Sequence, residues 1–481
     1  MSTSREGVGA GRAILVLTYR FPPQGGGGVQ RTLKFVKYLR REGWRPVVHT
    51  VSNPYWPLRD ESLAREIPGD VPVYRTPTFE FERLETRIGE WLGRARPASP
   101  QAGRSAPLAS RPSVEPTGLP EGEARLSRGG RFARLQDEVW RRWLVPDPQI
   151  AWYPGALLRS LWIARREGVA AIYSSSPPNS INVLALALER RLGLPWVADL
   201  RDPWTDGLRR RQWYNGNPAR QAREERWERL IFDRADHVLV TTDACRDTFL
   251  AKYPDCSAER IHLMTNGFDP EDFAHVEQAN RFLEPGLLHV TLTGNVETMF
   301  DAVPFFTAVH ELVSADPLAR ALLRVNFVGT KRQPRYDAFI AEQHLGDVIR
   351  FHGYVPHRDS VQYLAESQAL MLCQIPRYES AVVKLPGKMF EYLCLRKPVL
   401  ALTIPGVTTR ILDRARLGLL VAPDDVAGIK TILGRLVDGF SAGRIAADAD
   451  EAYVATFDRR EQARSLSLML DSAIAQHRSA A

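Results

Sequence analysis

The sequence predicts an α/β protein built from two doubly wound parallel sheets. Apolar runs of strand length alternate with helical patterns along the chain, and the whole alternation occurs twice. The length of 481 residues also exceeds the size at which a single hydrophobic core usually stops growing. We therefore expect two domains, each with its own sheet.

The first set of predicted strands lies in the N-terminal half of the chain. These buried apolar runs are 13–18, 45–51, 170–175, 195–200 and 236–241. Helical stretches between them end at Gly43 and Gly193, where a left-handed residue closes a helix. Asn179 or Ser180 is expected to cap the second of these helices first and to contact a ligand second.

The second set of predicted strands follows a short, polar and irregular stretch at 265–286, where we place the interdomain connection. Its members are 287–294, 322–329, 348–355, 369–375, 397–404 and 418–423. The predicted domains are therefore 1–278 and 279–456. Ligands of such sheets bind outside the carboxyl ends of the strands, so functional residues should gather there.

One segment inside the first domain lacks large apolar side chains. Residues 94–130 are rich in Pro, Ser, Ala, Gly and Arg, a composition typical of a disordered loop. The next stretch, 131–147, has Trp143 and several arginines at helical spacing. Such a helix can lie on an anionic membrane, and the alternative is a helix packed on its own domain.

Charge and cysteine content narrow the class of partner and compartment. The net charge of +8 and the pI near 9.4 permit an anionic partner, without deciding among nucleic acid, membrane and phosphorylated substrate. The four cysteines have no metal or disulfide spacing, and no run approaches the eighteen apolar residues of a membrane span. We expect a cytoplasmic protein, with peripheral contact to the inner face of the cytoplasmic membrane as an option.

The loop YRFPPQGGGGVQR at 19–31 follows the first strand. Its spacing fits neither the G-x-G-x-x-G dinucleotide fingerprint nor a Walker A loop. What remains is a strand, a glycine turn and a helix N-terminus near Val29, which favours an anion or sugar hydroxyls. The alternative is a glycine run tolerated in a surface loop. The residues assigned to this acceptor or phosphate loop are Gly25, Gly26, Gly27, Gly28 and Arg31.

A second candidate site is ADLRDPWTDG at 198–207, directly after a predicted strand. Four ionisable residues fall within eight positions, followed by an aromatic residue that suits a sugar ring. Arg201 and Asp202 are the catalytic candidates here. The alternative is an internal ion pair between Arg201 and an aspartate that fixes the turn.

A third candidate site lies in the second domain at 378–402. Gly387 opens a predicted helix on which Lys388 and Glu391 share one face. A lysine at a helix N-terminus suits a phosphate, and a carboxylate can accept hydrogen bonds from ribose hydroxyls. The alternative is an ordinary surface pair. Gly294, followed by Asn295, ends a strand where the backbone can approach a pyrophosphate.

These motifs together resemble the glycosyltransferases of the GT-B fold, in particular the family 4 group. The resemblance rests on FPPQGGGGVQR, DLRDPW, GYVPHRDSVQYLAESQALML and PGKMFEYLCLRKPVLA. It implies two Rossmann-like domains facing a central cleft, an acceptor domain followed by a donor domain, and a crossing helix at 457–481. It also implies a retaining transfer from a nucleotide-sugar, with neither metal nor other cofactor, to a glycan or lipid-linked acceptor.

The resemblance assigns Lys388 to the donor diphosphate and Glu391 to its ribose. Where the family has a Glu that contacts the transferred sugar, this chain has Val383, and Glu379 is the nearest carboxylate and the third catalytic candidate. The basic residues that often follow the glycine turn are missing after Gly294. We expect Lys384, Lys388 or the pair at 331–332 to neutralise the phosphates instead.

Three other functions remain open from the sequence alone. A nucleotide-sugar epimerase or a phosphorylase has the same two-domain architecture. A binding protein without catalysis would share the nucleotide site. Nucleic-acid binding is disfavoured, because the basic residues are spread over the chain without a recognition motif.

Overall fold

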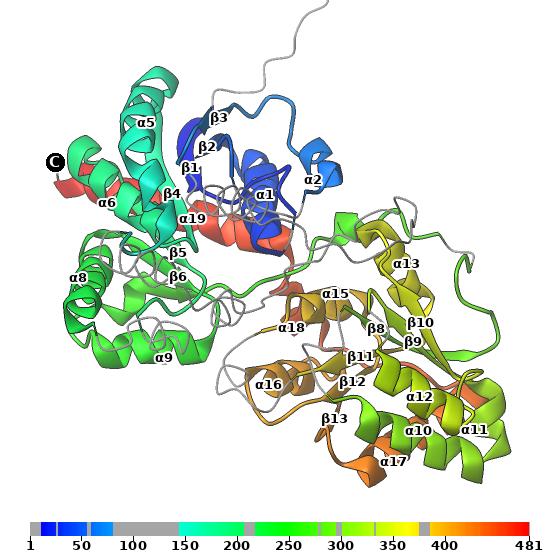
Figure 1. Cartoon of the computed structure of the whole chain (residues 1–481). Coiled ribbons are helices and arrows are strands. Elements are labelled where there is room, and N and C mark those ends of the chain that lie inside the picture. The colour runs from blue at the N-terminus through cyan, green and yellow to red at the C-terminus, as the bar shows by residue number, and fades with distance from the viewer. Residues whose placement is uncertain are drawn as a thin grey trace, which may run out of the picture. The chain divides into compact units, whose positions relative to one another are not determined.

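The computed structural model describes residues 11–25, 27–54, 59–79, 144–205, 217–277, 280–294, 301–330, 333–374 and 385–480. The chain forms two compact units, which Figure 1 shows with their elements labelled. The first comprises Met1–Thr241, Cys245–Met264 and Ala463–Ala481, and the second Thr242–Ala244 and Thr265–Gln462.

The first unit contains, among its described residues, a seven-stranded parallel sheet in the order β3-β2-β1-β4-β5-β6-β7. Its strands are β1 (Arg12–Thr18), β2 (Trp44–Val51), β3 (Val73–Thr76), β4 (Val169–Ser176), β5 (Trp196–Leu200), β6 (His237–Val240) and β7 (Ile261–Leu263). Its helices are α1 (Gly27–Leu39), α2 (Glu61–Arg65), α5 (Tyr153–Glu167), α6 (Ser180–Leu192), α8 (Pro218–Arg234), α9 (Asp243–Lys252) and α19 (Arg459–Ala480).

Helices cover both faces of this sheet. Alternate residues of β1 point to opposite faces, so Leu15 and Leu17 pack with α5, α6, α8 and α9, whereas Ile14 and Val16 pack with α1 and α19. A parallel sheet that is buried on both faces requires near-continuous apolar strands, which is what the sequence of β1 provides.

The second unit has its own parallel sheet, with six strands among the described residues in the order β10-β9-β8-β11-β12-β13. The strands are β8 (Leu288–Thr293), β9 (Leu323–Val328), β10 (Ile349–Gly353), β11 (Ala369–Cys373), β12 (Val399–Leu402) and β13 (Gly418–Val421). The helices are α10 (Val303–Ala315), α11 (Pro317–Leu322), α12 (Pro334–Glu342), α13 (His357–Glu366), α15 (Gly387–Leu395), α16 (Val407–Arg414), α17 (Val426–Ser441) and α18 (Glu451–Ala455).

Two separate cores hold the second sheet between helix layers. Phe305, Phe306 and Val309 of α10 pack on one face together with α12 and α17. Met389 and Phe390 of α15 pack on the other face together with α16. This face carries α15, the helix that the sequence assigns to the donor.

The predicted α/β class with two parallel sheets is confirmed. All eleven predicted strands are present, but β3 and β7 were missed because both are short edge strands with partly exposed residues. The glycine closures are also confirmed, since Gly43 and Gly193 have φ of 79° and 62°.

The cap predicted for α6 is confirmed in its position but not in its hydrogen bond. Asn179 takes the N-cap position, but its side chain makes no capping hydrogen bond. The carboxylate of Asp147 instead accepts from the Ser180 backbone N–H at 3.1 Å. A partner 33 residues away in the sequence therefore satisfies this helix end.

The first unit gives way to the second at Met264, earlier than residue 278. The reason is that the connecting stretch packs with the second unit. Phe268 lies in the core that includes α15, and the Glu277 N–H donates to the Gln362 side chain at 2.9 Å. The predicted loop 94–130, and Trp143 with most of the basic helix, lie outside the described residues.

Candidate functional site

The N-terminus of α15 lies at the carboxyl edge of the second sheet. Gly387 begins the helix, and the ammonium of Lys388 donates to the carbonyl of Thr293, the last residue of β8. One turn further along α15, the Tyr392 hydroxyl accepts from the Thr293 N–H at 3.3 Å and donates to the Met371 carbonyl at 3.2 Å. These contacts fix α15 against the ends of β8 and β11.

Two glycines meet at the same edge. Gly294 follows β8 with φ of 99°, and Gly329 follows β9 with φ of 82°, a region that L-residues rarely adopt. A Cβ atom at Gly329 would stand 3.4 Å from the Gly294 nitrogen. The Thr330 hydroxyl donates to the Gly294 carbonyl. The strand ends therefore present closely packed backbone next to the Lys388 ammonium.

Glu391 lies one turn after Lys388 on α15. Its side chain is 26% exposed, and the His357 Nε2 atom of α13 lies 4.0 Å from its carboxylate. Burial raises the pKa of Glu391, the nearby Asp272 adds to this effect, and His357 opposes it. The structure thus brings together four predicted donor residues, namely Gly294, Gly387, Lys388 and Glu391.

Gly387 faces open space. A Cβ atom built at this position would meet no atom of the described chain within 4 Å. Packing in the described residues therefore does not demand a glycine here. Free N–H groups at a helix N-terminus next to an ammonium form a positively charged surface that suits an anion.

In the first unit, Arg201, which follows β5, ties the end of β4 to the first turn of α1. Its guanidinium donates to the carbonyls of Ser176 at 2.6 Å and Gly28 at 2.8 Å, and to that of Pro177 at 3.4 Å. The alternative expected from the sequence, an ion pair between Arg201 and an aspartate, does not form among the described residues. Arg201 holds backbone instead, with its neighbour Asp202 exposed at the same edge.

The glycine loop lies against the Arg201 side chain. Gly27 and Gly28 form the first turn of α1, which begins two residues before the predicted Val29. A Cβ atom at Gly28 would stand 3.5 Å from the Arg201 Nη1 atom. Gly25 is buried, and Gly26 lies outside the described residues. Gly28 therefore faces the Arg201 side chain at ordinary contact distance.

Arg31 is a correction to the predicted loop site. Its side chain is fully buried and pairs with Asp199 of β5 through two hydrogen bonds of 2.7 and 3.0 Å. The Tyr173 hydroxyl donates to the same carboxylate at 2.6 Å. Burial disfavours the guanidinium charge, but Asp199 outweighs it and raises the pKa of Arg31. Arg31 thus joins α1 to the sheet and presents no charge to a ligand.

Two buried glutamates of α8 hold the turn after Arg201. The Trp204 indole N–H donates to Glu224 at 2.9 Å. Glu228 accepts from the Thr205 N–H at 3.1 Å, from the Thr205 hydroxyl at 2.6 Å and from the Lys252 ammonium at 2.8 Å. This support fixes the backbone on one side of Asp202.

Comparison with known families now identifies the class. Residues 117–272 match the model described as Glycosyltransferase Family 4, and residues 288–438 match the model described as Glycosyl transferases group 1. The two matches fall in order on the two predicted domains. The chain belongs to the glycosyltransferases of the GT-B fold.

Solved structures agree with this fold. The glycosyltransferase is similar to sucrose-phosphate synthase from Thermosynechococcus elongatus, with 15% identity, a TM-score of 0.55, and coverage of 97% of this chain and 100% of that one. HepE from Anabaena in complex with UDP has 14% identity and a TM-score of 0.54, with coverage of 96% of this chain and 100% of that one. UDP-GlcNAc 2-epimerase from Neisseria meningitidis bound to UDP-GlcNAc has 12% identity and a TM-score of 0.52, with coverage of 96% of this chain and 100% of that one. No curated protein matches the sequence.

Several residues predicted for the glycosyltransferase site lie outside the described residues. These are Asn295, Glu379, Val383, Lys384 and the basic pair at 331–332. In the part of the chain that is described, no helix is long and apolar enough to cross a membrane. The described residues also contain no cluster of three or more His, Cys, Asp or Glu side chains arranged to hold a metal ion.

Sequence reasoning missed two neighbours of Glu391. His357 of α13 lies 4.0 Å from the Glu391 carboxylate, and the negative charge of Asp272 contributes to the raised pKa of Glu391. His357 is part of GYVPHRDS, a stretch that carries the family resemblance, so the motif contained the signal. Asp272 comes from the interdomain stretch, where nothing in the local sequence points to α15.

Proposed function

We propose that this glycosyltransferase moves a sugar from a nucleotide-sugar donor to a sugar or lipid-linked acceptor in glycan, polysaccharide or glycolipid synthesis. The observation that carries the donor side is the arrangement of α15, which sets Gly387, Lys388 and Glu391 at the carboxyl ends of β8 and β11. This is where open parallel sheets bind their ligands.

In this proposal, each group on α15 has one role toward the donor. Lys388 neutralises the diphosphate, and the Gly387 N–H at the start of α15 approaches its oxygens. Glu391 accepts hydrogen bonds from the ribose hydroxyls. As the sugar leaves, negative charge grows on the diphosphate, and a fixed ammonium and helix N-terminus stabilise that charge without rearranging.

The first unit is the acceptor side of the proposal. Asp202 is exposed at the carboxyl edge of the first sheet, on a turn fixed by Arg201 and by the glutamates of α8. We propose that Asp202 orients an acceptor hydroxyl, while Arg201 holds the turn. Glu379 is proposed to contact the transferred sugar. The transfer is proposed to proceed with retention and without a metal.

The test is product analysis by NMR. The enzyme is incubated with UDP-, GDP- and ADP-sugars, with and without octyl glycosides as acceptor probes. The proposal expects nucleoside diphosphate and a new glycoside to appear together, with the anomeric configuration of the donor, and Lys388→Ala to lower the rate at least tenfold. A product of inverted configuration, or no glycoside from any pair, would contradict it.

An epimerase is the second candidate, because UDP-GlcNAc 2-epimerase shares the fold. The same incubation without acceptor separates the two functions. An epimerase converts the donor sugar into its epimer in the absence of any acceptor. The glycosyltransferase leaves the donor sugar's configuration unchanged under these conditions.

A further inference from the structure

The outer face of α5 combines apolar and cationic side chains. Leu158 and Trp162, one turn apart, are 72% and 41% exposed. Arg159, Arg165 and Arg166 are exposed on the same helix. Large apolar side chains in water are unfavourable, and two of them on successive turns form a stripe. The stripe and its arginines are the feature that the proposed reaction does not use.

The opposite face of α5 anchors the helix firmly. Ala156, Ser160, Ile163 and Ala164 are buried in the first unit. The Ser160 hydroxyl lies 2.7 Å from the His49 Nδ1 atom. Because these residues fix α5, Leu158 and Trp162 are held on its outer side, where the Trp162 ring also packs edge-to-face on Tyr74 at 5.7 Å.

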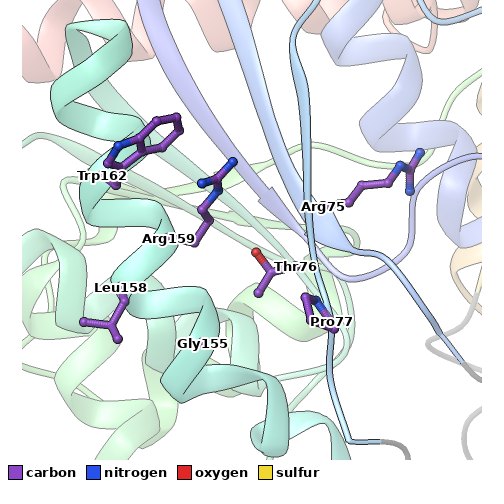
Figure 2. Close-up of a pocket in the computed structure, with 7 residues that line it drawn as sticks. All are labelled: Arg75, Thr76, Pro77, Gly155, Leu158, Arg159 and Trp162. Atoms are coloured by element: carbon purple, nitrogen blue, oxygen red, sulfur yellow. The ribbon is translucent and has the colours of Figure 1, made fainter.

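A groove of about 470 Å³ runs between α5 and the end of β3. Leu158, Arg159 and Trp162 of α5 all line this groove, and Figure 2 shows Arg159 turned toward the β3 side of the helix. The Arg159 guanidinium carbon lies 4.1 Å from the centre of the Trp162 ring and 5.4 Å from that of Tyr74. The groove thus has a cation held on aromatic rings at its wall.

The positive charges of Arg159, Arg165 and Arg166 are only partly neutralised by neighbouring carboxylates. Across the described ranges, neither Arg159 nor Arg165 has a carboxylate partner. Arg166 lies 3.7 Å from Glu167, but that carboxylate also accepts from Arg45 at 2.7 Å and from the Tyr74 hydroxyl at 2.5 Å. The face therefore carries net positive charge beside its apolar stripe.

We propose that this face of α5 docks the first unit on an anionic lipid bilayer. An anionic bilayer offers phosphate charge for the arginines and an acyl boundary for Leu158 and Trp162, whereas a soluble anion would leave the apolar stripe in water. Trp in particular favours the membrane interface. A lipid phosphate then sits in the groove beside Arg159. This proposal rests on the proposed function in one respect only, because a docked bilayer would bring a lipid-linked acceptor close to the enzyme.

Vesicle co-sedimentation without any donor tests this inference, so a failure of transfer activity leaves it untouched. Wild type should bind vesicles of phosphatidylglycerol and should bind phosphatidylcholine at least tenfold more weakly. Leu158→Ala with Trp162→Ala, and Arg159→Gln with Arg165→Gln, should each weaken binding to phosphatidylglycerol at least tenfold. Leu468→Ala and Arg444→Gln, which change exposed residues elsewhere, are the matched controls.

A second measurement reports on Trp162 directly. Brominated phosphatidylglycerol should quench part of the tryptophan emission of wild type, and Trp162→Phe should remove that part. Wild-type binding by the Leu158 and Trp162 double variant, or equal quenching in Trp162→Phe, would overturn the proposal. A drop from dimer to monomer in that double variant by sedimentation equilibrium would also overturn it, in favour of a second copy of the chain.

Discussion

At the scale of single residues, Gly387 is a position where the effect of a substitution on packing can be measured apart from its effect on ligand binding. Alanine favours helices over glycine, and a methyl group here would contact no atom of the described chain within 4 Å. We expect Gly387→Ala to keep or slightly raise the thermal midpoint. Nucleotide affinity should fall about tenfold, because the methyl group stands where the diphosphate approaches.

Gly434→Ala in α17 is the control for this change. Its methyl group would lie 3.8 Å from the Leu312 side chain, an ordinary contact, and far along the chain from the donor residues. Calorimetry should show unchanged nucleotide binding in this variant. Equal nucleotide affinity in both variants would mean that nothing approaches Gly387 closely.

His49 makes the stability of the first unit depend on pH in the acidic range. Burial lowers the pKa of His49 to about 3, with a smaller contribution from Arg159, while an unfolded histidine titrates near its ordinary value of 6.5. Between these pH values the unfolded chain binds the extra proton. Stability is therefore lost as the pH falls from 6.5 toward 3, by up to about 1.4 kcal/mol per pH unit.

Replacing His49 by Gln should remove this part of the acid dependence. The comparison uses urea unfolding of the two proteins from pH 7 to pH 4, followed by the circular dichroism of the helices. The difference in unfolding free energy between wild type and variant should shrink as the pH falls. A difference that stays constant over this range would show that His49 is not held neutral.

Residues that depend on distant partners were the ones that the sequence analysis misjudged. Lys388 and Glu391 were placed correctly on one helix because their relation is local. Arg31 meets Asp199 across 168 positions, and Arg201 meets Gly28 across 173. No local pattern reveals such pairings, so two arginines next to candidate loops looked available for ligands when the fold uses them itself.

At the scale of elements, α8 supports the turn that follows β5. Glu228 is fully buried and accepts from Thr205, Lys252 and Tyr253. Glu228→Ala would remove the buried carboxylate that accepts from all three of these side chains. We expect a loss of about 3 kcal/mol in unfolding free energy, the usual cost of breaking a buried pair on one side.

Glu225→Ala on the same helix is the matched control. Glu225 is half-buried, and its carboxylate makes an exposed hydrogen bond by accepting from the Gln221 side chain at 2.8 Å, so this change should cost less than about 0.5 kcal/mol. Urea unfolding measures both variants. If they lose stability equally, Glu228 does not support the turn.

Strands differed in how well the sequence predicted them. The central strands are buried on both faces and read as unbroken apolar runs, which makes them visible without an alignment. The edge strands β3 and β7 carry exposed residues such as Arg75 and Leu263, so their apolar signal is diluted. Edge strands are therefore harder to predict from the sequence than central strands.

At the scale of the whole molecule, the chain is organised as two units with a shared last helix. α19 begins with Arg459–Gln462 in the second unit and continues from Ala463 in the first. Ala463, Leu466 and Leu470 pack in the first unit's core with α1. The doubled strand and helix pattern made the two sheets predictable, and the packing of 265–277 on the second unit shifted the boundary from the expected position.

We propose that the second unit binds a nucleoside diphosphate through α15. Isothermal titration calorimetry with UDP, GDP and ADP tests it on wild type, Lys388→Ala and Glu391→Ala. Lys430→Ala, which breaks an exposed pair with Glu311 in the same unit, is the control. At least one of these nucleotides should bind wild type and the control equally, and should bind both α15 variants at least tenfold more weakly. Wild-type affinity in both α15 variants would contradict it.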